Sequence, residues 1–187
     1  MRTLAGIVLR ITGWELVGDP PRDRSYVLIA APHTSNWDLF FLLSFAFRYG
    51  VKIHWMGKRQ IFRAPFGGVM KRLGGIPIDR GRRENVVEQM AKRLVTGEPM
   101  VLVVPAAGTR GPGEYWKSGF YHIANLANVP IRLGYLDFAK RHGSFGPELT
   151  PTGDIPADMD RIREFYRDKV GRHPDRQTRV RLQEEDD

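Results

Sequence analysis

Cysteine is absent from this 187-residue sequence, and so is any long run of apolar residues. Without cysteine the chain can form no disulfide framework, no thiolate nucleophile and no cysteine-based metal site. A helix that crosses a bilayer needs ~20 consecutive apolar residues, and no segment approaches that length, so we expect no membrane span. The length and the mixture of apolar and charged residues instead predict a single globular domain.

Acidic residues are fewer than basic ones. The chain holds 29 Lys and Arg against 21 Asp and Glu, which gives a formal net charge of +8 and a pI near 10.0. Such a charge favours an anionic partner, and it leaves phospholipid headgroups, a phosphorylated substrate, a CoA-like cofactor and nucleic acid all open. The histidines show no metal-ligand spacing, and we predict no metal site.

Residues 1–17 carry an apolar stripe at the spacing of one helix face, formed by Leu4, Ile7, Val8 and Ile11. Arg10 interrupts the run and no small-residue cleavage site follows, so we expect the segment to be retained rather than removed as a signal peptide. Two interpretations stay open. The helix either contacts an anionic membrane surface or packs on the core of the domain.

Apolar runs and helical periodicities alternate along the rest of the chain. Strands are expected at residues 26–31, 51–56, 76–78, 100–104 and 131–136, and helices at 37–48, 65–73, 84–95, 119–127 and 157–170. This alternation predicts an α/β fold with helices flanking a central sheet that is mostly parallel or mixed. Residues 1–171 are expected to form that single domain, and the charged residues 172–187, which nearly lack apolar side chains, a mobile tail.

The loop between the first expected strand and its helix, at residues 33–38, combines a histidine with a carboxylate. Residues five apart on one continuous helix point ~140° away from each other, so His33 and Asp38 can pair only if His33 lies in a turn before the helix. Pro32 and the polar residues after His33 favour that turn. Asp38 would then orient the imidazole, and His33 would act as a general base. With no cysteine and no nucleophile-elbow serine, direct attack by a substrate hydroxyl is the simplest mechanism.

Two arginines stand just after later strands of the expected sheet. Arg80 follows residues 76–78, and Arg110 follows the strand at 100–104 through Gly108 and Thr109. Taken alone, each arginine is more simply a solvated surface charge. At one edge of a sheet, however, two guanidinium groups can hold a phosphate bidentately, while Gly108 admits backbone amides and Thr109 adds a donor.

Together these features resemble the glycerolipid acyltransferase family that includes the 1-acylglycerol-3-phosphate acyltransferases. His33 and Asp38 match that family's His-x4-Asp motif, and residues 75–80, 108–110 and 129–131 resemble its next three blocks in the same order. The resemblance implies that His33 deprotonates the acceptor hydroxyl, that Asp38 orients His33, and that Arg80 and Arg110 bind the acceptor phosphate. It also implies a lysophospholipid-like acceptor, an acyl-CoA or acyl carrier protein donor, and no tightly bound cofactor.

The third block departs from the family pattern. It usually reads Pro-Glu-Gly-Thr-Arg, whereas here Ala106 and Ala107 precede Gly108, and a proline stands one place earlier at Pro105. Three explanations stay open: a subfamily with another acceptor, a weakened or inactive homologue, or an engineered Glu-to-Ala change. Because the expected base is His33, the missing carboxylate need not abolish the chemistry.

The expected setting is the cytoplasmic face of a membrane, where a basic protein without a membrane span binds an anionic surface peripherally. The enzyme would serve phospholipid biosynthesis there. A non-catalytic lipid-binding homologue, prompted by Ala107, is the alternative from another functional class. Nucleic acid is suggested by charge alone, and because the chain lacks any recognition helix or RNA-binding motif we expect no nucleic-acid partner.

Overall fold

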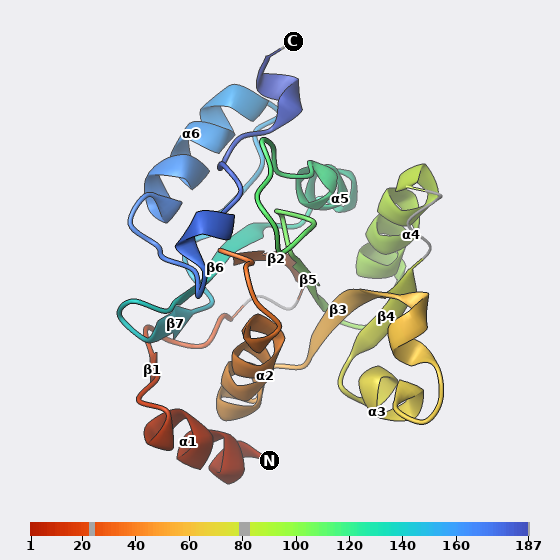
Figure 1. Ribbon diagram of the computed structural model, residues 1–187. Helices are drawn as coiled ribbons and strands as arrows, with labels where there is room; N and C mark the ends of the chain where they lie inside the picture. The colour runs from red at the N-terminus through yellow and green to blue at the C-terminus, as the bar shows by residue number, and fades with distance from the viewer. Residues whose placement is uncertain (23–24, 79–82, 187) are drawn as a thin grey trace.

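The structure is a computed structural model that describes residues 1–22, 25–78 and 83–186 (Figure 1). Its helices are α1 (Arg2–Ile11), α2 (Trp37–Tyr49), α3 (Gly67–Arg72), α4 (Arg83–Thr96), α5 (Gly119–Ala127) and α6 (Ile155–Tyr166), with short 3-10 helices η1 (Arg59–Phe62), η2 (Pro174–Arg176) and η3 (Gln183–Glu185). Its strands are β1 (Glu15–Leu16), β2 (Tyr26–Ala31), β3 (Ile53–Lys58), β4 (Gly75–Ile78), β5 (Val101–Val104), β6 (Ile131–Asp137), β7 (His142–Ser144) and β8 (Glu148–Leu149). Every strand and helix expected from the sequence coincides with one of these elements, with its ends shifted by a few residues.

The strands form one mixed sheet in the order β1-β7-β6-β2-β5-β3-β4, and β8 also pairs with β6. The central strands β6, β2, β5, β3 and β4 are mutually parallel, whereas β7 and β8 run antiparallel to β6. The expected single α/β domain with a mostly parallel or mixed sheet is therefore confirmed. The register sets Ile29 opposite Val104 and Ala31 opposite Tyr135, so neighbouring strands end at the same edge.

Helices cover both faces of the sheet, which explains why its central strands read as continuous apolar runs. Figure 1 shows α1, α2 and α3 on one side and α4, α5 and α6 on the other. In β2, Leu28 packs into the core beneath α2, while Val27 and Ile29 pack into the core beneath α5 and α6. Each face thus buries alternate residues of the same strand.

The order of the connections places a crevice at one edge of the sheet. β2 leads into α2 on one face, and its neighbour β5 leads through residues 105–118 into α5 on the opposite face. Open α/β sheets bind their ligands at such a switch point, outside the carboxyl ends of the strands. The loop at 32–36 and the loop at 105–118 meet there.

The C-terminal segment differs from the mobile tail that its composition suggests. Leu182 is 0% exposed and belongs to the core beneath α5 and α6, and Val180 packs against that core. The Trp116 backbone amide donates a 2.7 Å hydrogen bond to the Arg181 carbonyl. These apolar side chains hold residues 172–186 on the domain together with several hydrogen bonds, among them Arg163 Nε to the Val180 carbonyl. Few apolar residues are enough when they reach an existing core.

Helix α1 packs on α2 through Ala5 and Leu9, which are buried. Its other apolar side chains, Leu4, Ile7 and Ile11, stay exposed. Of the helices that the structure describes, none combines the length and the apolar character that crossing a membrane requires.

Candidate active site

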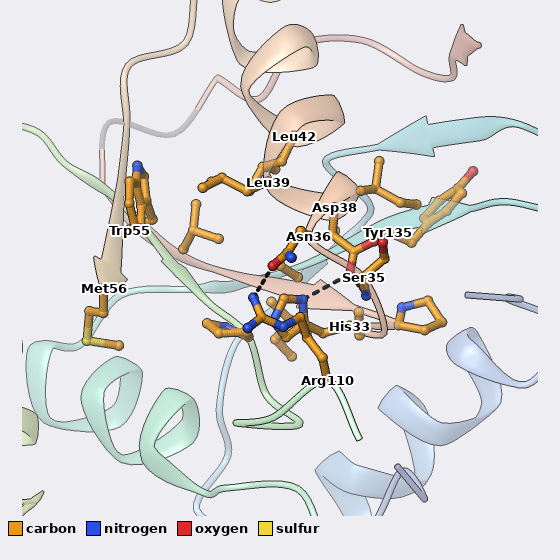
Figure 2. Close-up of a pocket in the computed structure, with 18 of the residues that line it drawn as sticks. His33, Ser35, Asn36, Asp38, Leu39, Leu42, Trp55, Met56, Arg110 and Tyr135 are labelled. Atoms are coloured by element: carbon orange, nitrogen blue, oxygen red, sulfur yellow. Dashed lines mark hydrogen bonds and ion pairs between the residues drawn. The ribbon is translucent and has the colours of Figure 1, made fainter. Parts of the chain in front are cut away.

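The turn that precedes α2 brings the histidine and the carboxylate together. His33 Nδ1 lies 3.0 Å from Asp38 Oδ2, and the same oxygen accepts hydrogen bonds from the backbone amides of Thr34 at 2.9 Å and Ser35 at 3.0 Å (Figure 2). Asp38 is buried in the first turn of α2. One carboxylate oxygen therefore shapes the turn and positions the imidazole, which is the geometry that the His-x4-Asp spacing predicts.

The hydrogen bond to Asp38 determines which nitrogen of His33 is basic. A carboxylate oxygen only accepts, so Nδ1 carries the proton that is shared with Asp38 and Nε2 is left with its lone pair. The His33 side chain is 20% exposed and lines a cavity, so it is neither a core residue nor fully solvated. This arrangement provides a positioned proton acceptor at the carboxyl edge of the sheet.

The loop after β5 packs against this turn. The Gly108 amide donates to the Pro105 carbonyl at 2.8 Å, and Gly108 has a φ of +67°, a conformation that favours glycine. A Cβ atom at this position would also lie 2.9 Å from Lys117 Cγ. Arg110 Nη1 donates to Asn36 Oδ1, which links the loop directly to the turn before α2 (Figure 2).

The structure brings most of the expected site residues together. Gly108, Thr109 and Arg110 line the same cavity as His33 and Asp38. Arg80 lies outside the described residues. The strand before it, β4, pairs with β3 so that Ile78 stands opposite Lys58, and Lys58 lines the cavity.

Ala106 and Ala107, where the block departs from its usual form, are buried away from this cavity. Both belong to the core beneath α5 and α6, and neither contributes to the cavity lining. The Ala106 carbonyl accepts a 2.8 Å hydrogen bond from the Lys117 amide. Position 107 is therefore a core position in this chain, and a larger polar side chain there would have to enter an apolar cluster.

The cavity has a volume of about 660 Å³ and extends from the polar residues into the space between α2 and β3. Its apolar lining includes Leu39, Leu42, Phe45, Trp55, Met56, Ile61, Val103, Leu136 and Phe145. The sequence did not single out the three that lie on α2, because this helix is apolar nearly all round and helical periodicity cannot identify its cavity-facing side. A polar entrance that opens into an apolar chamber suits an amphipathic substrate.

Tyr135, on β6, also lines the cavity, but Figure 2 shows its phenol oxygen directed away from His33 and Arg110. Its ring packs against Phe165 of α6 and lies 5.0 Å from Lys169 Nζ. Burial, and after it the charge of Asp137, raise the pKa of Tyr135 above its ordinary value, so the phenol stays protonated. Among the residues that the structure describes, no three His, Cys, Asp or Glu side chains form a group able to hold a metal ion.

The fold and this site together define an α/β domain with an oriented histidine beside a largely apolar cavity. Residues 14–132, more than half of the chain, match the family model described as Acyltransferase. The chain belongs to this acyltransferase family, and it is an enzyme of acyl transfer. The resemblance drawn from the four sequence blocks is thereby confirmed at the level of the family.

A solved structure supports the same assignment of the fold. The chain resembles the 1-acyl-sn-glycerophosphate (LPA) acyltransferase PlsC from Thermotoga maritima with a TM-score of 0.59, over 89% of this chain and 75% of that chain. The two sequences are 13% identical, so the likeness concerns the fold. No curated protein sequence matches this chain.

Proposed function

We propose that this enzyme transfers a fatty acyl group from acyl-CoA or acyl carrier protein to a hydroxyl of a lysophospholipid-like acceptor similar to 1-acylglycerol-3-phosphate. The observation that carries the proposal is the 3.0 Å contact between His33 Nδ1 and Asp38 Oδ2 at the entrance of an apolar cavity. Membership of the acyltransferase family limits the chemistry to acyl transfer. The cavity and the basic residues around it support an acceptor with an alkyl chain and an anionic headgroup.

In the proposed mechanism His33 Nε2 takes the proton of the acceptor hydroxyl as its oxygen attacks the thioester carbonyl. The new C–O bond forms, the tetrahedral oxyanion collapses, and the C–S bond breaks. The proton then passes from the imidazolium to the departing thiolate, which leaves as a thiol. Asp38 keeps the imidazole in the productive tautomer and stabilises its transient positive charge.

The oxyanion requires donors that are not already engaged. The amides of Thr34 and Ser35 donate to Asp38, and the Gly108 amide donates to Pro105. Because these three amides are already engaged, the oxyanion would lie on the side of the loop that carries Thr109 and Arg110. The acyl chain would occupy the apolar part of the cavity, where each buried CH₂ contributes about 0.8 kcal/mol.

A peripheral position at the cytoplasmic face of an anionic membrane accompanies this proposal. Several exposed apolar side chains belong to α1, α2 and α3 or to the residue before α3, namely Leu4, Ile7, Ile11, Trp37, Phe40, Phe66 and Val69. Basic residues stand among them at Arg2, Arg10, Arg63, Lys71 and Arg72. An apolar surface with basic residues interleaved is suited to the headgroup region of an anionic bilayer.

A non-catalytic lipid-binding role was suggested by Ala107 in place of the family Glu. Because Ala107 is buried in the core and does not line the cavity, its identity removes no group from the proposed reaction site. The catalytic proposal is therefore preferred.

The test is a thioester-release assay on the full chain in mixed micelles. Acyl-CoA and acyl carrier protein donors are each combined with a panel of lysophospholipids that have and lack a phosphate monoester. The proposal predicts thiol release and diacylated product that both depend on the acceptor. Binding to phospholipid vesicles without acceptor-dependent release, across the whole panel, would favour the non-catalytic alternative.

A further inference from the structure

A second cavity of about 350 Å³ lies on the other side of the turn that carries His33. It is lined by Thr34, Ser35, Asn36, Trp37, Arg110, Arg172, His173 and Arg176. Three of these residues, Ser35, Asn36 and Arg110, also line the cavity that contains His33. The two cavities therefore adjoin across the turn and the Arg110 side chain.

The C-terminal segment docks on this turn through specific contacts. The His173 backbone amide donates a 3.2 Å hydrogen bond to the Thr34 hydroxyl. Gly171 lies so close that a Cβ atom there would be 2.8 Å from Thr34 Oγ1 and 3.1 Å from Pro32 Cβ. Residues 171–176 are thus held against the turn that precedes α2, and they bring Arg172 and Arg176 to the cavity.

Three arginines line this cavity, Arg110, Arg172 and Arg176. The contacts that the structure gives them neutralise little of their positive charge. Arg172 lies over the ring of Trp37, with its Cζ 5.5 Å from the ring centroid, and Arg110 donates to the neutral side chain of Asn36. Arg176 Nε is 3.9 Å from Asp175 Oδ2, at the outer limit of an ion pair. Guanidinium groups pair best with planar or tetrahedral oxyanions, which can accept several of their N–H donors at once.

Three of the eight residues that line this cavity, Arg172, His173 and Arg176, lie beyond the part of the chain that the family model matches. The match covers residues 14–132 and so includes Arg110, but it ends well before the two C-terminal arginines. Arg172 and Arg176 are consequently a feature of this chain's own C-terminal segment.

We propose that this second cavity binds the phosphate monoester of the acyl acceptor, with Arg172 and Arg176 completing a site that Arg110 shares with the reaction cavity. This inference rests on the proposed function, since it assigns the acceptor's headgroup to one side of the turn and its hydroxyl to the other. A phosphate monoester provides the charge and the number of acceptor oxygens that three guanidinium groups can satisfy. The phosphate source is the acceptor rather than the 3′-phosphate of CoA, because Asn36 and Arg110 connect the cavity directly to the His33 turn.

The first arm of the test measures binding of glycerol 3-phosphate to the full chain by isothermal titration calorimetry, without turnover. The variant Arg172→Gln/Arg176→Gln should bind about tenfold or more weakly than the wild type. Arg179→Gln is the matched control, because Arg179 belongs to the same segment, is exposed and does not line the cavity. It should bind like the wild type, and thermal melting establishes that all variants are folded. Equal affinity of the double variant and the wild type would overturn the proposal.

The second arm identifies the source of the phosphate. Glycerol 3-phosphate bound to the wild type should be displaced by a 1-acylglycerol-3-phosphate below its micellar concentration, and adenosine 3′,5′-bisphosphate should not compete. Competition by the bisphosphate alone would assign the cavity to the donor and overturn the proposal.

The third arm separates this inference from the proposed function by using His33→Ala. That variant should bind glycerol 3-phosphate normally, because His33 does not line the second cavity. Phosphate binding that depends on Arg172 and Arg176, in a wild-type protein that shows no acyl transfer, would support the site while removing the proposed function. Acyl transfer whose acceptor KM is unchanged in the double variant would remove the site while leaving the function intact.

Discussion

Among the single residues of the site, Asp38 has two roles: it closes the turn before α2 and it orients His33. Its Oδ2 atom accepts from His33 Nδ1 and from the amides of Thr34 and Ser35, so one oxygen both closes the turn and orients the base. Burial of the carboxylate strengthens each of these hydrogen bonds. The pairing of His33 with Asp38 is therefore shaped by hydrogen bonds within the turn itself.

Arg110 provides a test of acceptor recognition. Arg110→Ala removes a guanidinium group that lines both cavities, so the KM for a phosphate-bearing acceptor should rise about tenfold to a hundredfold, with kcat much less affected. Steady-state kinetics with varied acceptor at saturating donor measure the effect. Arg167→Ala, which removes an exposed arginine at the end of α6, is the control. An unchanged acceptor KM would contradict phosphate recognition by Arg110.

Ala107 provides a test of why the third block departs from the family pattern. Ala107→Glu places a carboxylate among the apolar side chains of the core beneath α5 and α6. We expect the free energy of unfolding to fall by about 3 kcal/mol or more, and activity to fall with it. Urea denaturation and the release assay measure both quantities. A variant that is as stable as the wild type and more active would show that this chain is a disabled form.

Sequence patterns located the residues that belong to local motifs and missed those that tertiary structure assembles. His33, Asp38, Gly108, Thr109 and Arg110 stand next to strand ends, where the chain itself predicts a shared edge. Arg172 and Arg176 reach the same turn only because the C-terminal segment folds back onto it. Neither periodicity nor residue spacing in the sequence predicts that contact.

At the scale of elements, the sequence predicted the long strands and helices and missed the short edge strands. β1, β7 and β8 are two or three residues long, too short for an alternating pattern to be recognised. The packing of the C-terminal segment on the domain was not predicted for a related reason. Its order depends on isolated apolar side chains, Val180 and Leu182, that find a core already formed by distant elements.

Leu182 tests whether this segment is an ordered part of the domain. Leu182→Ala should lower the free energy of unfolding by about 2–4 kcal/mol, because it leaves a cavity in a fully buried position. Gln183→Ala, at the exposed neighbouring position, is the control and should change stability by less than about 0.5 kcal/mol. Urea denaturation followed by tryptophan fluorescence measures both. Equal stability of Leu182→Ala and the wild type would mean that the segment does not dock.

At the scale of the whole molecule, the two faces of the sheet have different surfaces. The face that carries α1, α2 and α3 bears most of the exposed large apolar side chains, whereas α4 and α5 carry Val95 and Leu126. A membrane bound to the first face would bring lipid acceptors close to the cavity entrance. The charge of +8 would strengthen such an association at low salt.

Vesicle binding tests this orientation. Ile7→Glu/Ile11→Glu replaces two exposed apolar side chains of α1 with carboxylates, and binding to anionic vesicles should weaken about tenfold or more. Val95→Glu/Leu126→Glu makes the same change of charge on α4 and α5, and it should bind within about twofold of the wild type. Co-sedimentation over a range of lipid concentrations gives both affinities. Equal weakening by the two double variants would indicate a charge effect without a preferred face.

The central claim is that His33 is the base that activates the acceptor hydroxyl, and the most direct measurement is the single-turnover rate of acyl transfer in His33→Ala. We expect the single-turnover rate to fall about a thousandfold relative to the wild type, with an unchanged melting temperature. His122→Ala, which removes an exposed histidine of α5, should retain the wild-type rate. A His33→Ala rate within about tenfold of the wild type would contradict the assignment, because general-base catalysis contributes more than that.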